Sequence, residues 1–440
     1  MDELRFEHGW ENPAGAEGKE LRATWGHLRI SVGEWAVSRL YDHDVRSVSD
    51  RIYLPLYPVA EWMVENWWSI LYEVENKGNQ YTTEFAVRHD LNRATAGFAL
   101  PKLRFGAMGE HVQLHWQRVD MASKHVEFMS YGKQLVDRAQ VEQELTRFIA
   151  VVIDRLRSEE VHDTPLQRDW EAISKLTDDE RTFCKAAAMA GLDPFAITAK
   201  DADALITAAE RIPPSMVDDM LSIINGKGFA NALRELEGLE RLAQHADRAS
   251  QQLLKLRTDL DRGPVQNALP YEIGYAHATR VRATLGLNGD LLSTTDRLMH
   301  AVHVGNARSV VDHNFSLTEL EGFLGFKGDD CPMFVLGSEQ DSPQGRFKFS
   351  RCLHEFLFQD TAKPRLVTKA DNDAQRINRS FAAELLAPAH ALSKDVSGAG
   401  WVAWEFVEEL SHKYGVSSWL IRHQLVNQNI AKVRDDRDYV

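Results

Sequence analysis

The sequence predicts an α+β protein with a mixed α/β N-terminal domain over residues 1–158, a helical connector over 159–263 and a second mixed domain over 264–440. A length of 440 residues is typical of two or three domains. The front and back stretches combine short runs of β-branched and aromatic residues with segments of helical periodicity. Between them, apolar residues recur almost throughout at the three- and four-residue spacing of helices.

Composition and charge narrow the class of protein. Apolar residues make up 44% and charged residues 26% of the chain, as in ordinary globular proteins, so we expect a folded, soluble chain. The 51 lysines and arginines against 65 aspartates and glutamates give a formal net charge of −14. This charge disfavours non-specific binding of nucleic acid or anionic lipid over most of the surface, although a local basic patch could still bind them.

Cysteine usage and the N-terminal sequence favour the cytoplasm. The three cysteines, Cys184, Cys331 and Cys352, are odd in number and widely spaced, which excludes a disulfide framework and a CxxC metal site. The first residues, MDELRFEHGW, are acidic and polar, and the chain has no run of 18 apolar residues. We therefore expect neither a signal peptide nor a membrane span, and a cytoplasmic location.

In the N-terminal domain, strand and helix signals alternate. Residues 21–42 alternate as strands do on both sides of a tight connection at Gly33. After two prolines a helix is expected from about Val59. Residues 97–119 form a second strand pair with a turn at GAMGE, and residues 140–157 have clear helical periodicity.

Three tryptophans in seven residues, Trp62, Trp67 and Trp68, stand out on the helix predicted from Val59. The helical stripes direct Trp67 to a core and leave one of its neighbours only half covered. The simpler interpretation is an aromatic core. The alternative is a partner-binding surface, because an exposed tryptophan is a frequent anchor of protein interfaces.

The connector, rich in Asp and Glu, reads as amphipathic helices with solvated acidic faces, interrupted at Pro194 and at the pair Pro213–Pro214. No spacing of catalytic residues occurs in it.

The back domain is more informative. The strand-like MFVLG precedes a helix that carries His354 and Glu355, and a second helix follows about twenty residues later. Zinc peptidases place their ligands in this layout.

The pair His354–Glu355 is an incomplete HExxH motif. In HExxH, two histidines four residues apart on one helix face bind a single ion, and the glutamate polarises the water on it. Here the position four residues after His354 is Phe358, which has no lone pair to donate.

The segments around this motif resemble the ImmA/IrrE family of zinc metallopeptidases. That family pairs an RF..AHELgH helix with an E..AN.FAaeLLmP helix and ends in gVS...l..RL. The counterparts here are RFKFSRCLHEFLF, QRINRSFAAELLAP and YGVSSWLIRHQL, with LEGFLGF similar to the strand entry. The resemblance covers about residues 264–428 and implies a zincin-like fold. It also implies a bacterial protein, since members act on regulators such as helix-turn-helix repressors in stress or phage-response circuits.

Carried over to this sequence, the resemblance implies a damaged zinc site. The first ligand falls on His354 and the general base on Glu355, whereas the second histidine falls on Phe358 and the third ligand, a glutamate, on Gln375. A neutral carboxamide cannot offset the charge of the ion as a carboxylate does. We therefore expect no cofactor. Four nearby donors lack the family spacing: Cys352, Asp360, Asp373 and His390.

Other polar residues have simpler interpretations. His300 and His303 could share a metal, but a lone pair at this spacing is typically a surface or core feature. His111 and His115 are expected on a strand, where residues four apart stand about 13 Å from each other, too far for one ion. Glu384, in FAAELL, is expected to be structural.

The leading interpretation is a degenerate ImmA/IrrE-type domain that acts as a protein-binding or regulatory module. Its protein partner would contact the exposed member of the Trp62, Trp67 and Trp68 cluster or the cleft beside His354. One alternative is an active zinc metallopeptidase with altered ligands and Glu355 as base. Another is a nucleic-acid-sensing regulator in which residues 411–425 form a helix-turn-helix, although Trp419 and Leu420 have the character of core residues. No membrane partner is expected.

Overall fold

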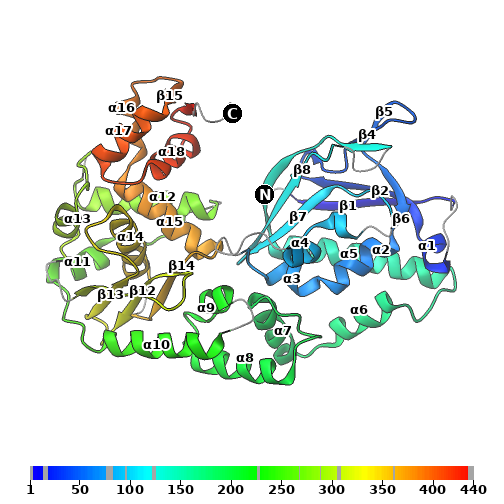
Figure 1. The fold of residues 1–440 in the computed structure, drawn as a ribbon, viewed down its shortest axis with the longest axis horizontal. Helices are drawn as coiled ribbons and strands as arrows, with labels where there is room; N and C mark the ends of the chain where they lie inside the picture. The colour runs from blue at the N-terminus through cyan, green and yellow to red at the C-terminus, as the bar shows by residue number, and fades with distance from the viewer. Residues whose placement is uncertain are drawn as a thin grey trace. The chain divides into compact units, whose positions relative to one another are not determined.

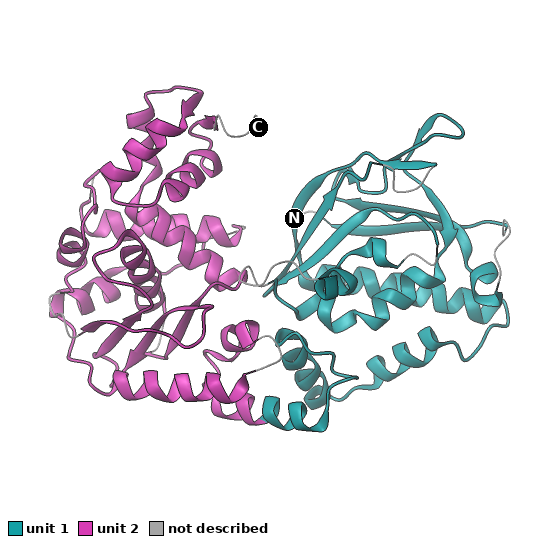
Figure 2. Ribbon diagram, viewed as in Figure 1, with its two compact units in different colours: residues 1–206 teal, residues 207–440 magenta. Residues whose placement is uncertain are grey.

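The computed structural model describes residues 3–12, 18–75, 83–94, 97–120, 125–224, 228–266, 268–287, 289–304, 309–359 and 362–434. The protein is α+β, with several small sheets and many helices (Figure 1). It forms two compact units, residues 1–206 and 207–440 (Figure 2). The helical connector predicted over 159–263 is not a unit of its own, because its helices divide between the two.

Unit 1 contains three small antiparallel sheets. The first has the order β1–β2–β3 with β6 also paired to β2, the second β10–β8–β7, and the third β5–β4–β9. The predicted turn at Gly33 is confirmed, since this glycine has a left-handed φ of 55° between β2 and β3. The strands are β1 (Leu4–Trp10), β2 (Trp25–Val32), β3 (Trp35–Ala36), β4 (Leu40–Asp42), β5 (Ser47–Ser49), β6 (Ile52–Pro55), β7 (Lys102–Met108), β8 (His111–Gln117), β9 (Val126–Phe128) and β10 (Gly132–Asp137).

Helices complete the core of unit 1. The longest, α5 (Arg138–Ser158), begins at Asp137, whose carboxylate accepts a hydrogen bond from the Gln140 amide at 3.1 Å. It buries one apolar stripe against the sheets. The others are α1 (Lys19–Ala23), α2 (Tyr57–Glu65), α3 (Trp67–Tyr72), α4 (Thr83–His89), α6 (Pro165–Lys175) and α7 (Asp178–Met189), with a 3-10 turn at Leu91–Arg93. The boundary between the two units falls within α8 (Ala199–Arg211).

The tryptophan cluster is core and not surface. Trp62, Trp67 and Trp68 are 5%, 3% and 4% exposed. The Trp62 indole donates to the carbonyl of Val87 at 2.9 Å, and the Trp67 ring meets Trp170 edge-on at 5.0 Å. The prediction that one of these rings is exposed for a partner is therefore wrong. Residues distant in sequence thus cover Trp62 and Trp67, and Trp68 stacks on Tyr72 of the same helix at 5.9 Å.

Unit 2 has a four-stranded sheet in the order β11–β13–β12–β14, in which β11 and β13 are parallel and the other pairs antiparallel. Helix α14 packs against this sheet, and α12 and α15 lie side by side. The elements of this part are α9 (Val217–Ile224), α10 (Phe229–Ala243), α11 (Gln251–Asp259), α12 (Pro270–Thr284), α13 (Thr295–Ala301), β11 (Val310–Asp312), β12 (Leu320–Phe326), β13 (Pro332–Leu336), α14 (Pro343–Phe358), β14 (Arg365–Thr368) and α15 (Asp373–Leu386).

A glycine sets the distance between α12 and α15. A side chain at Gly274 would place its Cβ 2.1 Å from the Ser380 hydroxyl and 2.2 Å from the Ile377 carbonyl. Only a residue without a side chain allows these helices to approach so closely. His277, one helical turn further along α12, is thereby brought to the side chains of α14.

The chain ends in a small subdomain of helices and a parallel two-stranded sheet, β15–β16. Its elements are α16 (Ala389–Val396), β15 (Trp401–Ala403), α17 (Trp404–Tyr414), α18 (Ser418–Asn427) and β16 (Lys432–Arg434). Leu420 packs partly buried on the core, but Trp419 is 61% exposed, so the expectation of a core tryptophan there is wrong. Within the described ranges, no helix combines the length and apolarity needed to cross a membrane.

Candidate functional site

Helix α14 presents His354 and Glu355 to the neighbouring helices. The Ser342 hydroxyl caps its first turn by accepting from the Gly345 amide at 2.9 Å, and Pro343 suits the first helical position. Phe349, Leu353 and Phe356 are fully buried.

His354 is held in an aromatic cluster. His354 is only 7% exposed, and its Nε2 lies 3.0 Å from Nδ1 of His277. His277 in turn stacks on Phe358, with ring centroids 3.8 Å apart and planes within 3°. Phe381 of α15 covers His354 at 5.0 Å. The side chain that stands where a second histidine ligand would be is thus packed against rings on two sides.

One hydrogen bond joins the two histidines. Burial, and then the charge of His354, lower the pKa of His277 to about 3, so the His277 imidazole is neutral. A neutral imidazole hydrogen-bonded to another must have one donor and one acceptor nitrogen at the contact. Nε2 of His354 is therefore engaged in this pair, and its Nδ1 lies 3.7 Å from Glu355 Oε1, beyond the length of a hydrogen bond.

Glu355 is enclosed by polar groups. Its side chain is 12% exposed, and its carboxylate accepts from the Asn378 amide at 3.2 Å and from the Gln359 amide at 2.9 Å. Burial alone would raise the pKa of Glu355, but His354 and Asn378, with the positive charge of Arg365, outweigh it and lower that pKa. Glu355 is accordingly a carboxylate at neutral pH, as a general base must be.

A fully buried arginine organises the interior beneath this pair. Arg351, one turn before His354, donates to Asn378 Oδ1 at 2.7 Å, to the Thr368 carbonyl at 2.8 Å and to Gln375 Oε1 at 2.7 Å. It also pairs with Glu321 of β12. Buried guanidinium groups need such complete pairing, and this one joins α14, α15, β12 and β14.

Gln375 lies beside Arg351 and hydrogen-bonds to the backbone of the sheet. Its Oε1 accepts from the Thr368 amide at 2.9 Å, and its Nε2 donates to the Leu366 carbonyl at 3.0 Å. The amide thus bonds β14 at two points along its outer edge, as a neighbouring strand would. A carboxylate could not supply the donor. The structure brings Asn378, and not Gln375, next to Glu355.

The segment before α9 covers the same strand. The Ser215 hydroxyl donates to the Pro364 carbonyl at 2.7 Å, and Arg365 donates back to the Ser215 carbonyl at 2.9 Å. Asp219 accepts from the Asn372 amide at 2.8 Å. Burial, with the nearby charge of Glu355, raises the pKa of Asp219 to about 6. The outer edge of β14 is therefore closed by side chains of the protein itself.

The residues around His354 do not fit a zinc ion. In the described part of the chain, no group of three His, Cys, Asp or Glu residues is placed to hold a metal. Catalytic zinc sites have three protein ligands, and His277 and His354 supply two nitrogens that face each other. Cys352 is fully buried against Gly322 of β12, and burial raises the pKa of its thiol to about 12. His390 is exposed on α16, Asp373 is in the first turn of α15, and Asp360 lies outside the described residues.

The remaining predicted positions lie elsewhere. His300 and His303 are exposed around the end of α13, and His111 and His115 lie on β8 in unit 1. The structural role of Glu384 agrees with its contacts, since it accepts from the Ala389 amide at 3.0 Å and from Gln424 at 2.9 Å. Burial raises the pKa of Glu384 to about 7.

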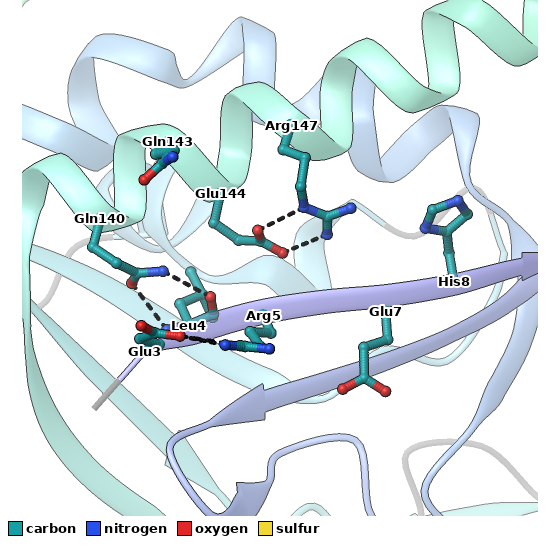
Figure 3. Close-up of a pocket in the computed structure, with 9 residues that line it drawn as sticks. All are labelled: Glu3, Leu4, Arg5, Glu7, His8, Gln140, Gln143, Glu144 and Arg147. Carbon is teal, nitrogen blue, oxygen red and sulfur yellow. Dashed lines mark hydrogen bonds and ion pairs between the residues drawn. The ribbon is translucent and has the colours of Figure 1, made fainter. Parts of the chain in front are cut away.

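A separate polar pocket of about 600 Å³ lies in unit 1 between β1 and α5 (Figure 3). Gln140 accepts from the Leu4 amide and donates to the Leu4 carbonyl, both at 3.0 Å. Glu144 accepts from the Phe6 amide at 2.5 Å and from Arg147 at 2.6 Å. Gln140, Glu144 and Arg147 of α5 are thus bonded to the strand or to each other.

Sequence reasoning missed His277, Arg351 and Asn378. Comparison of the chain with protein-family models, with curated proteins and with solved structures found no match.

Proposed function

We propose that residues 264–440 form an ImmA/IrrE-type, zincin-like domain that has lost zinc catalysis and acts as a protein-binding or regulatory module. Helix α14 with its His-Glu pair, backed by a mixed sheet and followed by α15, is compatible with that fold. The stack of His277 and Phe358 on His354 is the observation that carries the loss of catalysis. It puts an aromatic ring and a hydrogen-bonded imidazole where a zinc peptidase needs an ion and a water.

The resemblance suggests the class of partner. Enzymes of this resemblance recognise a polypeptide, so a domain without the chemistry can still bind a regulatory protein of a bacterial stress or phage-defence circuit. The contact lies beside His354 and Phe358. The tryptophan cluster of unit 1 has no part in it, because its rings are buried.

Metal analysis of the full chain, purified without chelator or metal-affinity resin, tests the proposal. We expect far less than one zinc per chain, and no hydrolysis of a casein substrate. One equivalent of zinc that is lost in His354→Ala would overturn it and favour the rival function, a metallopeptidase with altered ligands and Glu355 as base.

A further inference from the structure

The C-terminal subdomain exposes two tryptophans. Trp419 on α18 is 61% exposed and Trp401 on β15 is 52% exposed. The helix that carries Trp419 has a capped N-terminus. Gly415, with a left-handed φ of 65°, ends α17, and the Ser417 hydroxyl caps α18 by accepting from the Leu420 amide at 3.2 Å. Large indole surfaces left in water by an ordered element commonly mark a binding site.

Each of these indoles is accompanied by a guanidinium group. Arg422 lies over the Trp419 ring at 5.4 Å, and Arg434 lies over the Trp401 ring at 4.3 Å. Trp404 meets Trp419 edge-on at 5.7 Å and widens the aromatic surface on that side. The arrangement repeats the same pair, a flat ring with a cation beside it, on a helix and on a strand.

The stretch from Ser411 to Arg434 is basic, although Glu408, which accepts from the Trp404 indole at 2.8 Å, precedes it and Asp435 and Asp436 follow it. No aspartate or glutamate occurs between Leu410 and Arg434, although the chain as a whole has a net charge of −14. Within the described part of the protein, Arg422, Lys432 and Arg434 make no ion pair. Their charges are available to an anionic ligand, and the acidic remainder of the chain confines such a ligand to this region.

We propose that this aromatic–basic surface, made of Trp401, Trp419, Arg422, Lys432 and Arg434, binds single-stranded nucleic acid. Unpaired bases stack on exposed indoles, and their phosphates pair with the flanking cations. A duplex hides the faces of its bases, so it would leave the indoles unused. An acidic peptide without aromatic residues would pair with the cations but would leave the tryptophans uncovered. This surface is separate from the cleft beside His354 and goes beyond the function proposed above.

Binding of the full chain to a fluorescein-labelled 20-nucleotide oligo(dT) at 50 mM salt tests the proposal by fluorescence polarisation. We expect binding that weakens as salt rises, and a loss of about tenfold for Trp419→Ala or Trp401→Ala, since one stacked base contributes that much. Arg422→Ala should also lower the slope of log affinity against log salt by about 0.7, the value for one phosphate contact on a single strand.

Two variants are matched controls. Trp35→Ala removes an indole that is 62% exposed on β3 of unit 1, and Arg234→Ala removes an exposed arginine of α10. Neither should change the affinity. Trp419→Phe keeps a ring and should retain most of the binding, and thermal unfolding of every variant shows whether the fold is kept.

Three results would overturn the proposal. The first is no binding at 50 mM salt, and the second is binding that folded Trp419→Ala and Trp401→Ala leave unchanged. The third is equal competition by polyglutamate or by duplex DNA of the same length, which would indicate an acidic-peptide or a duplex surface instead.

Discussion

Two glutamines close the edge of a sheet in this protein, one in each unit, with different consequences. Gln140 bonds both backbone groups of Leu4 on β1, and Gln375 bonds Thr368 and Leu366 on β14. Free strand edges invite pairing with other chains, and a side-chain amide can occupy them because it carries a donor and an acceptor. Gln140 does so at the rim of a pocket, whereas Gln375 is 1% exposed.

The difference is in what else each amide contacts. Gln140 serves the strand alone, so water can replace it. Gln375 also accepts from the buried guanidinium of Arg351, which holds Asn378, and Asn378 holds Glu355. A glutamine thus only protects the strand edge in unit 1, whereas in unit 2 a glutamine is also part of a buried hydrogen-bond network. This teaches that the carboxamide at position 375 is not simply a lost ligand, because the sheet depends on it.

Replacement of Gln375 should have the largest effect. Gln375→Leu leaves the Thr368 amide and the Leu366 carbonyl without partners and removes one acceptor from Arg351, which we expect to lower the free energy of unfolding by about 3 kcal/mol or more. Urea denaturation of the full chain measures it. Gln344→Leu, at an exposed position of α14, is the matched control and should change little. A loss no larger than the control would contradict the network.

Opposite pH dependence should follow from one carboxylate in each unit. The pKa of Asp219 is raised to about 6, so the folded state binds the extra proton and stability falls as pH rises from about 4 to 6. Asp219→Asn should therefore stabilise the protein at pH 7, by roughly 1–2 kcal/mol.

Glu73 is the comparison in unit 1. Burial alone would raise its pKa, but hydrogen bonds from His89 and Arg88 prevail and lower the pKa to about 2. Its contribution is present above pH 4.5 and is lost as pH falls, so Glu73→Gln should destabilise the protein at pH 7, by roughly 2 kcal/mol. Thermal unfolding between pH 2 and 8 separates the two, because the Asp219 effect develops between about pH 4 and 6 and the Glu73 effect between about pH 4.5 and 2. Shifts of the same sign would refute the assignment.

Restoring a metal site tests whether position 375 or position 378 corresponds to the third zinc ligand of the resemblance. Phe358→His with Gln375→Glu follows the resemblance, and Phe358→His with Asn378→Glu follows the contacts of Glu355. We expect the second pair to bind zinc at least tenfold more tightly, since Gln375 faces Arg351 and β14. Competition with a chelating dye measures it. The exchange of Phe358 costs roughly 1–3 kcal/mol in stability, so folding is checked by circular dichroism. Tighter binding by the first pair would restore position 375 as the ligand.

The sequence predicted what depends on local pattern. The α+β class, the helix that carries His354 and Glu355, the strand pair of β7 and β8 and the turn at Gly33 follow from periodicity and turn residues. Burial of the tryptophan cluster agrees with its simpler interpretation as an aromatic core, but the residues that cover it from distant positions, Val87 and Trp170, did not follow from the sequence. The sequence did not point to His277 for the same reason. It lies 77 residues before His354, and only the close approach of α12 at Gly274 brings the two together.

The smallest effect is expected where the amide is solvent-accessible. Gln140→Ala removes two hydrogen bonds to Leu4, but water enters from the pocket of Figure 3, so we expect a loss of about 1 kcal/mol in the free energy of unfolding. Gln143→Ala is the matched control, because Gln143 lines the same pocket from the same helix without a bond to β1. Amide hydrogen exchange at Leu4 should quicken in Gln140→Ala and not in Gln143→Ala. A loss as large as that of Gln375→Leu would show that a side-chain amide stabilises an edge strand whether or not water can reach it, and that Arg351 adds nothing to the network in unit 2.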